Sequence, residues 1–322
     1  MLIYLLVILG FVLLIYGGNV LVDGAVAVAK HLKVSPLLIG LTLVGFGTSV
    51  PELITSLFAA GMHAEGIAVG NVVGSNIVNI LLVLGTAAAI QEIVVHLESF
   101  KRDASFLILS TVILGIALLI GRINAFMGLI MCGVLVFYTI YAYRMDVEQE
   151  KRNQPAPAPT APHRTRHHIF YSKELWKSVG KTVLGILMTI AGARVLVENA
   201  VVLAERWGVS ETVIGLTIVA LGTSVPELMT SIIASLKHHG SLAFGNIVGS
   251  NIYNALFILG FTALFMPVEV PRYIFFDVLI MMGVTGLLLY FGRNGKISRR
   301  EGRIFIGLYG AYLVYLAIGT LF

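Results

Sequence analysis

The chain repeats itself after 175 residues. Residues 36–85 align without a gap with residues 211–260, and 28 of these 50 positions are identical. The stretch GTSVPE stands at 47–52 and again at 222–227, and GSNIVN at 74–79 corresponds to GSNIYN at 249–254. Such self-similarity is typical of a structure that uses one folding unit more than once. Any fold for this chain must therefore accommodate the same unit twice.

Both copies lie in long apolar runs. Hydrophobic residues make up 57% of the 322 residues and charged residues 12%, whereas about 25% of the residues in soluble proteins are charged. A helix that crosses a hydrocarbon core of about 30 Å needs about 20 mostly apolar residues. Ten runs reach that length, at 2–28, 36–61, 67–90, 104–121, 123–143, 174–204, 211–236, 241–266, 273–292 and 301–322. The sequence thus predicts an all-α polytopic membrane protein with ten transmembrane helices. The first run is too long for a cleaved signal peptide and lacks its basic start.

The basic residues predict the orientation of these spans. Connections between ten spans alternate between two sides of the membrane. One side carries 18 Lys and Arg residues, and the other carries Arg122, Arg206 and Arg272. An excess of basic residues marks the cytoplasmic side, so both termini are predicted to face outward. This bias accounts for the net charge of +5, and no nucleic-acid partner is needed to explain it.

Each half of the chain holds five spans, an odd number, so the second half must enter the membrane upside down relative to the first. We expect an N-terminal half at 1–143, a cytoplasmic linker at 144–172 rich in proline and alanine, and a C-terminal half at 173–322. Such a linker composition favours extended, unpacked chain. Inverted repeats are typical of secondary transporters, whose binding site lies near the membrane midplane between the repeats.

The repeated GTSVPE places a carboxylate inside a span twice. Glu52 and Glu227 are expensive at that depth, and ionisable residues there are usually functional. Pro51 and Pro226 lack an amide hydrogen and disturb the hydrogen bond to the carbonyl four residues earlier. Those carbonyls belong to glycines, Gly47 and Gly222, which also loosen a helix. We expect two kinked or broken helices with free carbonyl oxygens, which membranes tolerate only where backbone is buried in protein or lines a wet cavity.

Neutral oxygens surround these glutamates in the sequence. Hydroxyls and amides are contributed by Thr48, Ser49, Thr223 and Ser224, and by the next span of each half through Asn71, Ser75, Asn79, Asn246, Ser250 and Asn254. Oxygen-only ligation suits hard cations, and Ca²⁺ takes about six to eight oxygens. Two glutamates balance one Ca²⁺, two Na⁺ or two H⁺. The residues therefore predict a cation site that different ions can neutralise in turn.

With these motifs the chain resembles the cation/Ca²⁺ exchanger superfamily, specifically the prokaryotic sodium/calcium exchangers. The resemblance rests on the two alpha repeats, 39–85 and 214–260, and on their GTSVPE, GSNIVN and GSNIYN motifs. It implies a multi-pass protein of a prokaryotic inner membrane that exchanges Na⁺ for Ca²⁺, extrudes Ca²⁺, moves net charge and needs no cofactor. The first and sixth spans would slide as a pair to give alternating access.

The resemblance also implies the ion ligands. The Ca²⁺ site would use Glu52, Glu227, Thr48 and Thr223. The Na⁺ sites would use the same two glutamates, the carbonyls of Gly45 and Ala220, and the side chains of Ser49, Ser224, Ser75, Ser250, Asn79 and Asn254. Many members of the superfamily carry an aspartate where this chain has Asn254, so the pocket holds two carboxylates rather than three. Ion stoichiometry and the involvement of protons stay open on this ground.

Other functions remain as alternatives. An H⁺/Ca²⁺ antiporter or a K⁺-dependent Na⁺/Ca²⁺ antiporter would use the same glutamates. A cation channel is disfavoured, because channels usually place symmetric subunits around an axis along the membrane normal. An enzyme is disfavoured because the spans lack the aspartate or serine–histidine pairs that intramembrane catalysis needs. The linker at 144–172 is too short for a large regulatory domain.

Three further charged residues lie near the helices expected to slide. Asp23 and Glu198 are equivalent under the 175-residue shift, and Arg194 lies four residues before Glu198. We favour salt bridging or interfacial anchoring over gating for the two acids. Arg194 is expected to snorkel or to pair with an acid.

Overall fold

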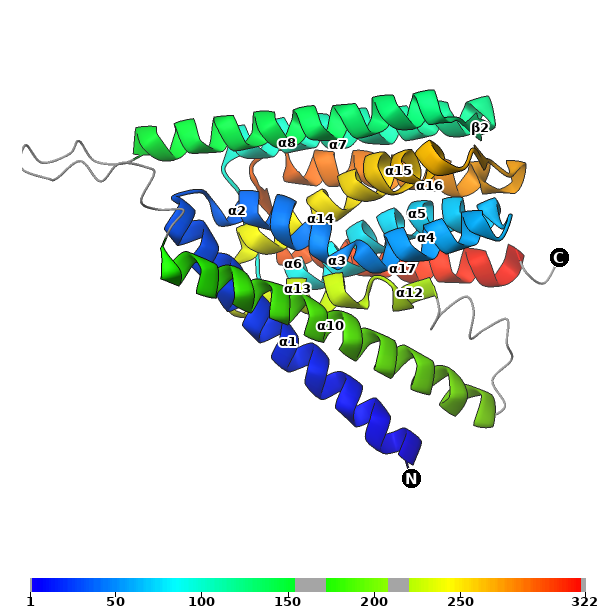
Figure 1. The fold of residues 1–322 in the computed structure, drawn as a ribbon, viewed down its shortest axis with the longest axis horizontal. Coiled ribbons are helices and arrows are strands. Elements are labelled where there is room, and N and C mark those ends of the chain that lie inside the picture. The colour runs from blue at the N-terminus through cyan, green and yellow to red at the C-terminus, as the bar shows by residue number, and fades with distance from the viewer. Residues whose placement is uncertain (1, 154–171, 208–219, 320–322) are drawn as a thin grey trace, which may run out of the picture.

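The structure of the chain is a computed structural model that describes residues 2–153, 172–207 and 220–319 (Figure 1). Nearly all of these residues are helical. The first half contains α1 (Leu2–Leu32), α2 (Pro36–Ile39), η1 (Gly40–Val44), α3 (Gly45–Thr48), α4 (Val50–Gly61), α5 (Glu65–Val78), η2 (Asn79–Leu84), α6 (Gly85–Ile90), α7 (Leu97–Ile120) and α8 (Ala125–Asn153). The second contains α10 (Lys173–Arg206), α12 (Ala220–Gly222), α13 (Val225–Leu236), α14 (Gly240–Ile252), η4 (Tyr253–Ile258), α15 (Leu259–Phe265), η5 (Arg272–Ile274), α16 (Phe275–Gly292) and α17 (Arg299–Gly319).

Most of the predicted spans are present as membrane-length helices. Within the described ranges, eight helices are long and apolar enough to cross a membrane, and the bent pair Pro36–Thr48 and Val50–Gly61 makes a ninth. The predicted run at 211–236 begins outside the described residues, and its described part, Val225–Leu236, is a shorter apolar helix. The structure therefore agrees with an all-helical membrane protein, while the tenth span remains a prediction.

One predicted boundary differs from the structure. The span expected at 123–143 continues as α8 to Asn153, so the start of the expected linker at 144 lies inside a helix. The Asp146 carboxylate near the end of α8 accepts hydrogen bonds from the backbone N–H and the hydroxyl of Ser35. Ser35 is the N-cap of α2, so the extended end of α8 holds the start of the segment that leads into the first GTSVPE. Residues 154–171 of the expected linker lie outside the described part.

The helices α1 and α10 form an antiparallel pair that runs obliquely beside the other helices (Figure 1). Glycines let the two backbones touch. Gly10 and Gly17 of α1 lie against Leu196 and Met188, and Gly185 of α10 lies against the backbone of Leu21. Small residues at a membrane helix interface permit such close approach. The two helices expected to move together are thus packed as one unit.

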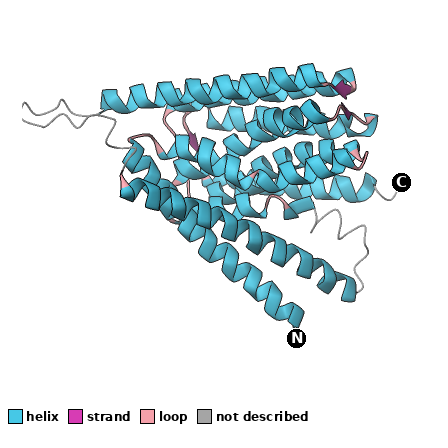
Figure 2. Cartoon of the chain, in the orientation of Figure 1, coloured by secondary structure: helices cyan, strands magenta, loops and turns pink. Residues whose placement is uncertain are grey.

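Two short strand pairs connect the halves. β1 (Ile93–Val94) pairs with β4 (Lys296–Ile297), and β2 (Arg122–Ile123) pairs with β3 (Val268–Glu269), both antiparallel. The strands appear at opposite ends of the bundle in Figure 2. The 175-residue shift superposes Ile93 on Val268, so each strand pair joins one half to the other in a reciprocal way. This exchange of partners is what a two-fold relation between the halves would produce.

The glycine contacts between α1 and α10 predict opposite effects for two alanine substitutions on the same helix. In Gly185→Ala the new methyl group has no room beside the backbone of Leu21, whereas the space around Gly180 is open. We expect Gly185→Ala to lower the thermal midpoint of the purified protein in detergent. Gly180→Ala should leave it unchanged or raise it slightly, because alanine favours a helix over glycine by up to about 1 kcal/mol. Equal effects of the two substitutions would contradict this packing.

Candidate ion-binding site

Both GTSVPE motifs break a helix at the same residue. Ser49, between α3 and α4, has φ −83° and ψ 4°, and Ser224, between α12 and α13, has φ −88° and ψ 4°. In each case a proline occupies the first turn of the following helix, where its missing amide hydrogen costs nothing. In the first half the two parts of the span are bent by 41°. The predicted breaks are therefore present in both repeats, with one backbone geometry.

The breaks bring two carboxylates into the interior of the bundle. Glu52 and Glu227 lie in the first turns of α4 and α13 and are both 0% exposed. They lie close enough for their charges to interact. The N-terminal turn of a helix favours negative charge, which offsets part of the cost of burial. No basic side chain forms an ion pair with either glutamate among the described residues.

Each carboxylate has hydroxyl groups of the opposite repeat beside it, and Glu227 also has the hydroxyl of Ser250 from its own repeat. The hydroxyls of Thr223 and Ser224 lie around Glu52. Those of Thr48, Ser49 and Ser250 lie around Glu227, and Ser49 Oγ donates to Glu227 Oε1 at 3.5 Å. The seven oxygen-bearing residues of this group come from α3, α4, α13, α14 and the two breaks. Residues far apart in sequence thus meet at one point.

Two asparagines position the threonines, and each belongs to the opposite repeat. Thr48 Oγ1 lies 3.2 Å from Asn246 Oδ1, and Asn246 Nδ2 donates to Ser231 Oγ at 3.1 Å. In the other half, Thr223 Oγ1 lies 3.4 Å from Asn71 Oδ1, and Asn71 Nδ2 donates to Ser56 Oγ at 3.1 Å. A threonine that donates its proton to an amide keeps its lone pairs for a cation. The two series of hydrogen-bonded side chains are therefore Thr48–Asn246–Ser231 and Thr223–Asn71–Ser56. The serines were missed in the sequence, although 56 and 231 are identical in the repeat alignment.

Several buried polar atoms of this region have no hydrogen-bond partner within the described part of the chain. They include both carboxylate oxygens of Glu52, Oε2 of Glu227, the hydroxyl of Ser224 and the side-chain amides of Asn79 and Asn254. Leaving such a group unpaired costs about 1–3 kcal/mol. A cluster of oxygens of this kind is what a hard cation ligates. Among the described residues no three His, Cys, Asp or Glu side chains gather as a metal group, so a cation here must rely largely on neutral oxygens.

The remaining predicted ligands lie around this centre. Asn79 and Asn254 are buried in π-helical turns, η2 and η4, and such turns are frequent at functional sites. The Gly45 carbonyl accepts from Ser250 Oγ at 3.4 Å. Ser75 is 3% exposed and lines the cavity described next. Ala220 begins α12, on the segment that leads to Thr223, and its role as a ligand remains a prediction.

The glycines of the breaks face α10. Gly47 lies against Ile186 and Gly222 against Val197. A side chain at Gly47 would displace α10, so the glycines serve the approach of α10 as well as the loosening of the helix that the sequence suggested. The moving pair and the site are therefore in direct contact.

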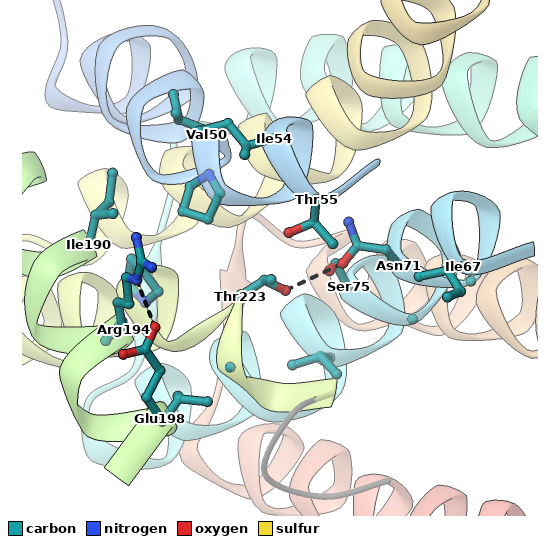
Figure 3. A pocket seen from close by; sticks show the side chains of 18 of the residues that line it. Val50, Ile54, Thr55, Ile67, Asn71, Ser75, Ile190, Arg194, Glu198 and Thr223 are labelled. Carbon is teal, nitrogen blue, oxygen red and sulfur yellow. Dashed lines mark hydrogen bonds and ion pairs between the residues drawn. The ribbon is translucent and has the colours of Figure 1, made fainter. Parts of the chain in front are cut away.

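A cavity of about 870 Å³ opens from this centre between α4, α5, α10 and α17 (Figure 3). Its walls include Pro51, Ser75, Thr223 and Pro226, so it reaches the breaks. Its lining includes Tyr309, Tyr312 and Leu316 in the second half of α17, so it lies toward the end of that helix. On the other side of the site, Gly245 and Gly249 of α14 pack directly on the backbone of α2 and η1. Among the described residues, this cavity therefore reaches the site from the end at which α17 ends.

The expected salt bridges of the outlying charged residues are present. Arg194 Nε lies 2.7 Å from Glu198 Oε1 on the same helix, as Figure 3 shows. Asp23 Oδ1 lies 2.7 Å from Lys237 Nζ, which belongs to the end of α13. The interpretation of Asp23 and Glu198 as salt-bridging acids is confirmed, and so is the pairing of Arg194 with an acid.

Comparison with known proteins identifies a family and several relatives that this chain resembles. The family described as "Sodium/calcium exchanger protein" matches residues 2–144 and 177–318. The chain is 37% identical to "Putative antiporter CaxA" of Alkalimonas amylolytica, covering 95% of this chain and 96% of that protein. It is 33% identical to "Sodium/calcium exchanger MaX1" of Methanosarcina acetivorans, covering 97% and 98%.

A solved structure shares the fold. The sodium-calcium exchanger NCX_Mj, soaked with Na⁺ and Sr²⁺, superposes with a TM-score of 0.82 at 30% sequence identity, covering 98% of both chains. The family match spans both halves, and the relatives match over nearly their whole length. The chain therefore belongs to the sodium/calcium exchanger protein family, as a prokaryotic-type member of the cation/Ca²⁺ exchanger superfamily.

Proposed function

We propose that the chain is a secondary antiporter that exchanges Na⁺ for Ca²⁺ by alternating access and extrudes Ca²⁺. The observation that carries this proposal is the pair of buried glutamates at two equivalent helix breaks, each with threonine and serine hydroxyls of the other repeat beside it. Membership of the exchanger family, and the names of relatives such as MaX1, support Na⁺ and Ca²⁺ as the substrates.

Charge explains why these two ions compete for one site. The Glu52 and Glu227 carboxylates are neutralised by one Ca²⁺ or by Na⁺ ions, and leaving both charged in a dry interior is unfavourable. The Ca²⁺ ligands in this proposal are Glu52, Glu227, Thr48 and Thr223. The Na⁺ ligands are the same glutamates with Gly45, Ala220, Ser49, Ser224, Ser75, Ser250, Asn79 and Asn254. Because the ion-free site is charged, the conformational change that would occlude it is penalised unless an ion is bound, which produces obligatory exchange.

Access alternates through the α1–α10 pair. This pair packs through glycines as one unit and touches the breaks at Gly47 and Gly222. In the structure a cavity reaches the site from the end of the bundle at which α17 ends. A sliding movement of the pair would close this cavity and open a path at the opposite end, so that the inverted repeats exchange roles.

Transport in proteoliposomes tests the exchange. We expect ⁴⁵Ca²⁺ uptake into vesicles loaded with Na⁺, and no uptake into vesicles loaded with choline, K⁺ or an acidic buffer. Glu52→Gln and Glu227→Gln should each reduce uptake about 30-fold or more, since losing one partner of a desolvated charge interaction costs about 2–5 kcal/mol. The matched control is Glu148→Gln, at an exposed position on α8. Uptake driven by the proton gradient alone would instead assign an H⁺/Ca²⁺ antiporter, and uptake that survives both substitutions would place the site elsewhere.

Thermal stability tests Ca²⁺ binding without transport. Ca²⁺ at about 100 times its dissociation constant stabilises a folded site by about 2.7 kcal/mol, so the thermal midpoint of the purified protein should rise with Ca²⁺. Mg²⁺ should raise it less at equal concentration, because it dehydrates reluctantly. The Ca²⁺ effect should disappear in Glu52→Gln. A Ca²⁺ effect of equal size in that variant would contradict the assignment of Glu52 as a ligand.

The sign of the transport current tests whether exchange is electrogenic. If three Na⁺ leave for each Ca²⁺ that enters, one positive charge leaves the vesicle per cycle. Addition of Ca²⁺ to Na⁺-loaded vesicles on a solid-supported membrane should then give a sustained current opposite in sign to Ca²⁺ entry. Glu227→Gln vesicles supply the baseline. An absent sustained current alongside active ⁴⁵Ca²⁺ uptake would indicate two Na⁺ per Ca²⁺, in keeping with the two-carboxylate pocket.

A further inference from the structure

One ion pair ties the α1–α10 unit to the rest of the bundle. Among the ion pairs of the described residues, four join residues at most four positions apart, and only Asp23–Lys237 joins distant segments. Lys237 Nζ lies 2.7 Å from Asp23 Oδ1 and 3.4 Å from the backbone oxygen of Asn19. Lys237, at the end of α13, therefore contacts α1 through the Asp23 carboxylate and through the Asn19 carbonyl, which lies one turn earlier in α1.

Packing continues this attachment along α1. The tip of the Ile233 side chain of α13 lies against Gly18, so an added side chain there would require Ile233 to shift. Ile233 is buried. The contact between α1 and α13 thus extends from Gly18 to Asp23, at the end of the bundle opposite the cavity.

His239 is the titratable neighbour of this ion pair. It is the N-cap of α14. Burial, followed by the positive charge of Lys30, lowers the pKa of His239. The imidazole is therefore neutral near pH 7 and adds no charge that competes with Lys237 for Asp23.

The other half of the chain lacks this attachment. The 175-residue shift superposes Asp23 on Glu198 and Lys237 on Met62. Met62 is 76% exposed and carries no charge. Glu198 pairs instead with Arg194 of its own helix, and both line the cavity. An ion pair within one helix moves with that helix and holds it to nothing else.

Apolar packing shows the same asymmetry. The shift superposes Gly18 on Ala193 and Ile233 on Phe58. Phe58 is 69% exposed, and Ala193 lines the cavity. In this conformation α1 is thus docked on α13, while the equivalent faces of α10 and α4 stand apart on either side of the cavity.

We propose that the Asp23–Lys237 ion pair is a one-sided latch that favours the conformation whose cavity opens toward the chain termini. Asp23 and Lys237 are positioning residues that touch no transported ion. Moving the α1–α10 unit to close the cavity breaks this pair, and the opposite end forms no substitute because Met62 stands where a lysine would be needed. The inference rests on the alternating-access movement of the proposed function, and it concerns which conformation the ion-free protein prefers.

The size of the effect follows from the exposure of the pair. Asp23 is 63% exposed and Lys237 29% exposed at the side chain, and exposed ion pairs contribute about 0.2–1 kcal/mol. Removing the pair should therefore shift the ratio of the two conformations about 1.5- to 5-fold. A shift of this size alters transport rates without abolishing transport.

A labelling experiment tests the latch without Na⁺ or Ca²⁺. The reporter is Gly74→Cys, which lines the cavity at a position where no described residue lies within 4 Å of an added side-chain carbon. The background carries Cys132→Ser, which removes the chain's one cysteine. The full chain in nanodiscs is reacted with a membrane-impermeant maleimide, and the labelling rate reports the fraction of protein with an open cavity.

Lys237→Met reproduces the residue of the other repeat. It should lower the open-to-closed ratio about 1.5- to 5-fold and lower the labelling rate, which follows the open fraction, by at most that factor, as should Asp23→Asn. The charge swap Asp23→Lys with Lys237→Asp should restore the parent rate. Glu198→Gln is the matched control, since its ion pair lies within one helix, and it should leave the rate unchanged. The thermal midpoint of each variant reports whether it folds, and the two single substitutions test the same pair from opposite sides.

Unchanged labelling in both Lys237→Met and Asp23→Asn would overturn the latch, and so would a charge swap that fails to restore the rate. Labelling that responds equally to Glu198→Gln would also overturn it. The result is independent of ion coupling. A protein that failed the Na⁺-driven uptake assay could still show the latch, and an active exchanger could lack it.

Discussion

The burial of two carboxylates in an apolar bundle is the constraint on which the rest of this structure depends. Glu52 and Glu227 are fully buried and interact with each other, so their repulsion must be balanced by helix N-termini, by neutral hydroxyls and by a cation. The helix breaks at Ser49 and Ser224 create those N-termini in the middle of spans. The asparagines of α5 and α14 then orient the threonines across the repeat interface. Each of these features would be a defect in a soluble core or a simple membrane helix, and together they form one site.

The repeats also explain how a rigid bundle can present one site to two sides. Closely related sequences occupy both halves, but their surroundings differ in this conformation. Gly245 and Gly249 of α14 are packed against the backbone of α2 and η1, whereas among the described residues none lies within 4 Å of a side-chain carbon placed at Gly74 of α5. One end of the site is therefore closed by backbone contact and the other is reached by a cavity. Because inverted units can exchange environments, the opposite arrangement is available to the same chain at modest cost.

Departures from the repeat are as informative as the repeat itself. Lys237 corresponds to Met62 in the other repeat, and Glu198, which corresponds to Asp23, forms its ion pair with Arg194 of the same helix. These differences do not touch the ion-binding residues. They act at the ends of the bundle, where they bias the balance between conformations that the identical parts leave nearly even. The extended α8, whose Asp146 caps α2, likewise belongs to one half.

The sequence by itself determined the membrane class, most of the spans, the helix breaks and the chemical type of the site. These follow from local properties: run length, the missing amide hydrogen of proline, and the cost of a carboxylate in hydrocarbon. It also predicted that Arg194 would snorkel or pair with an acid, and the acid proved to be Glu198, one turn away on the same helix. The sequence did not reveal that Thr48 would contact Asn246 of the other repeat in addition to the Val44 carbonyl of its own, nor that Ser56 and Ser231 would contact Asn71 and Asn246. It did not show that Asp23 would find Lys237 or that α8 would reach Asn153. These depend on which helices lie side by side, and such contacts between distant segments are decided only when the two halves pack together in three dimensions.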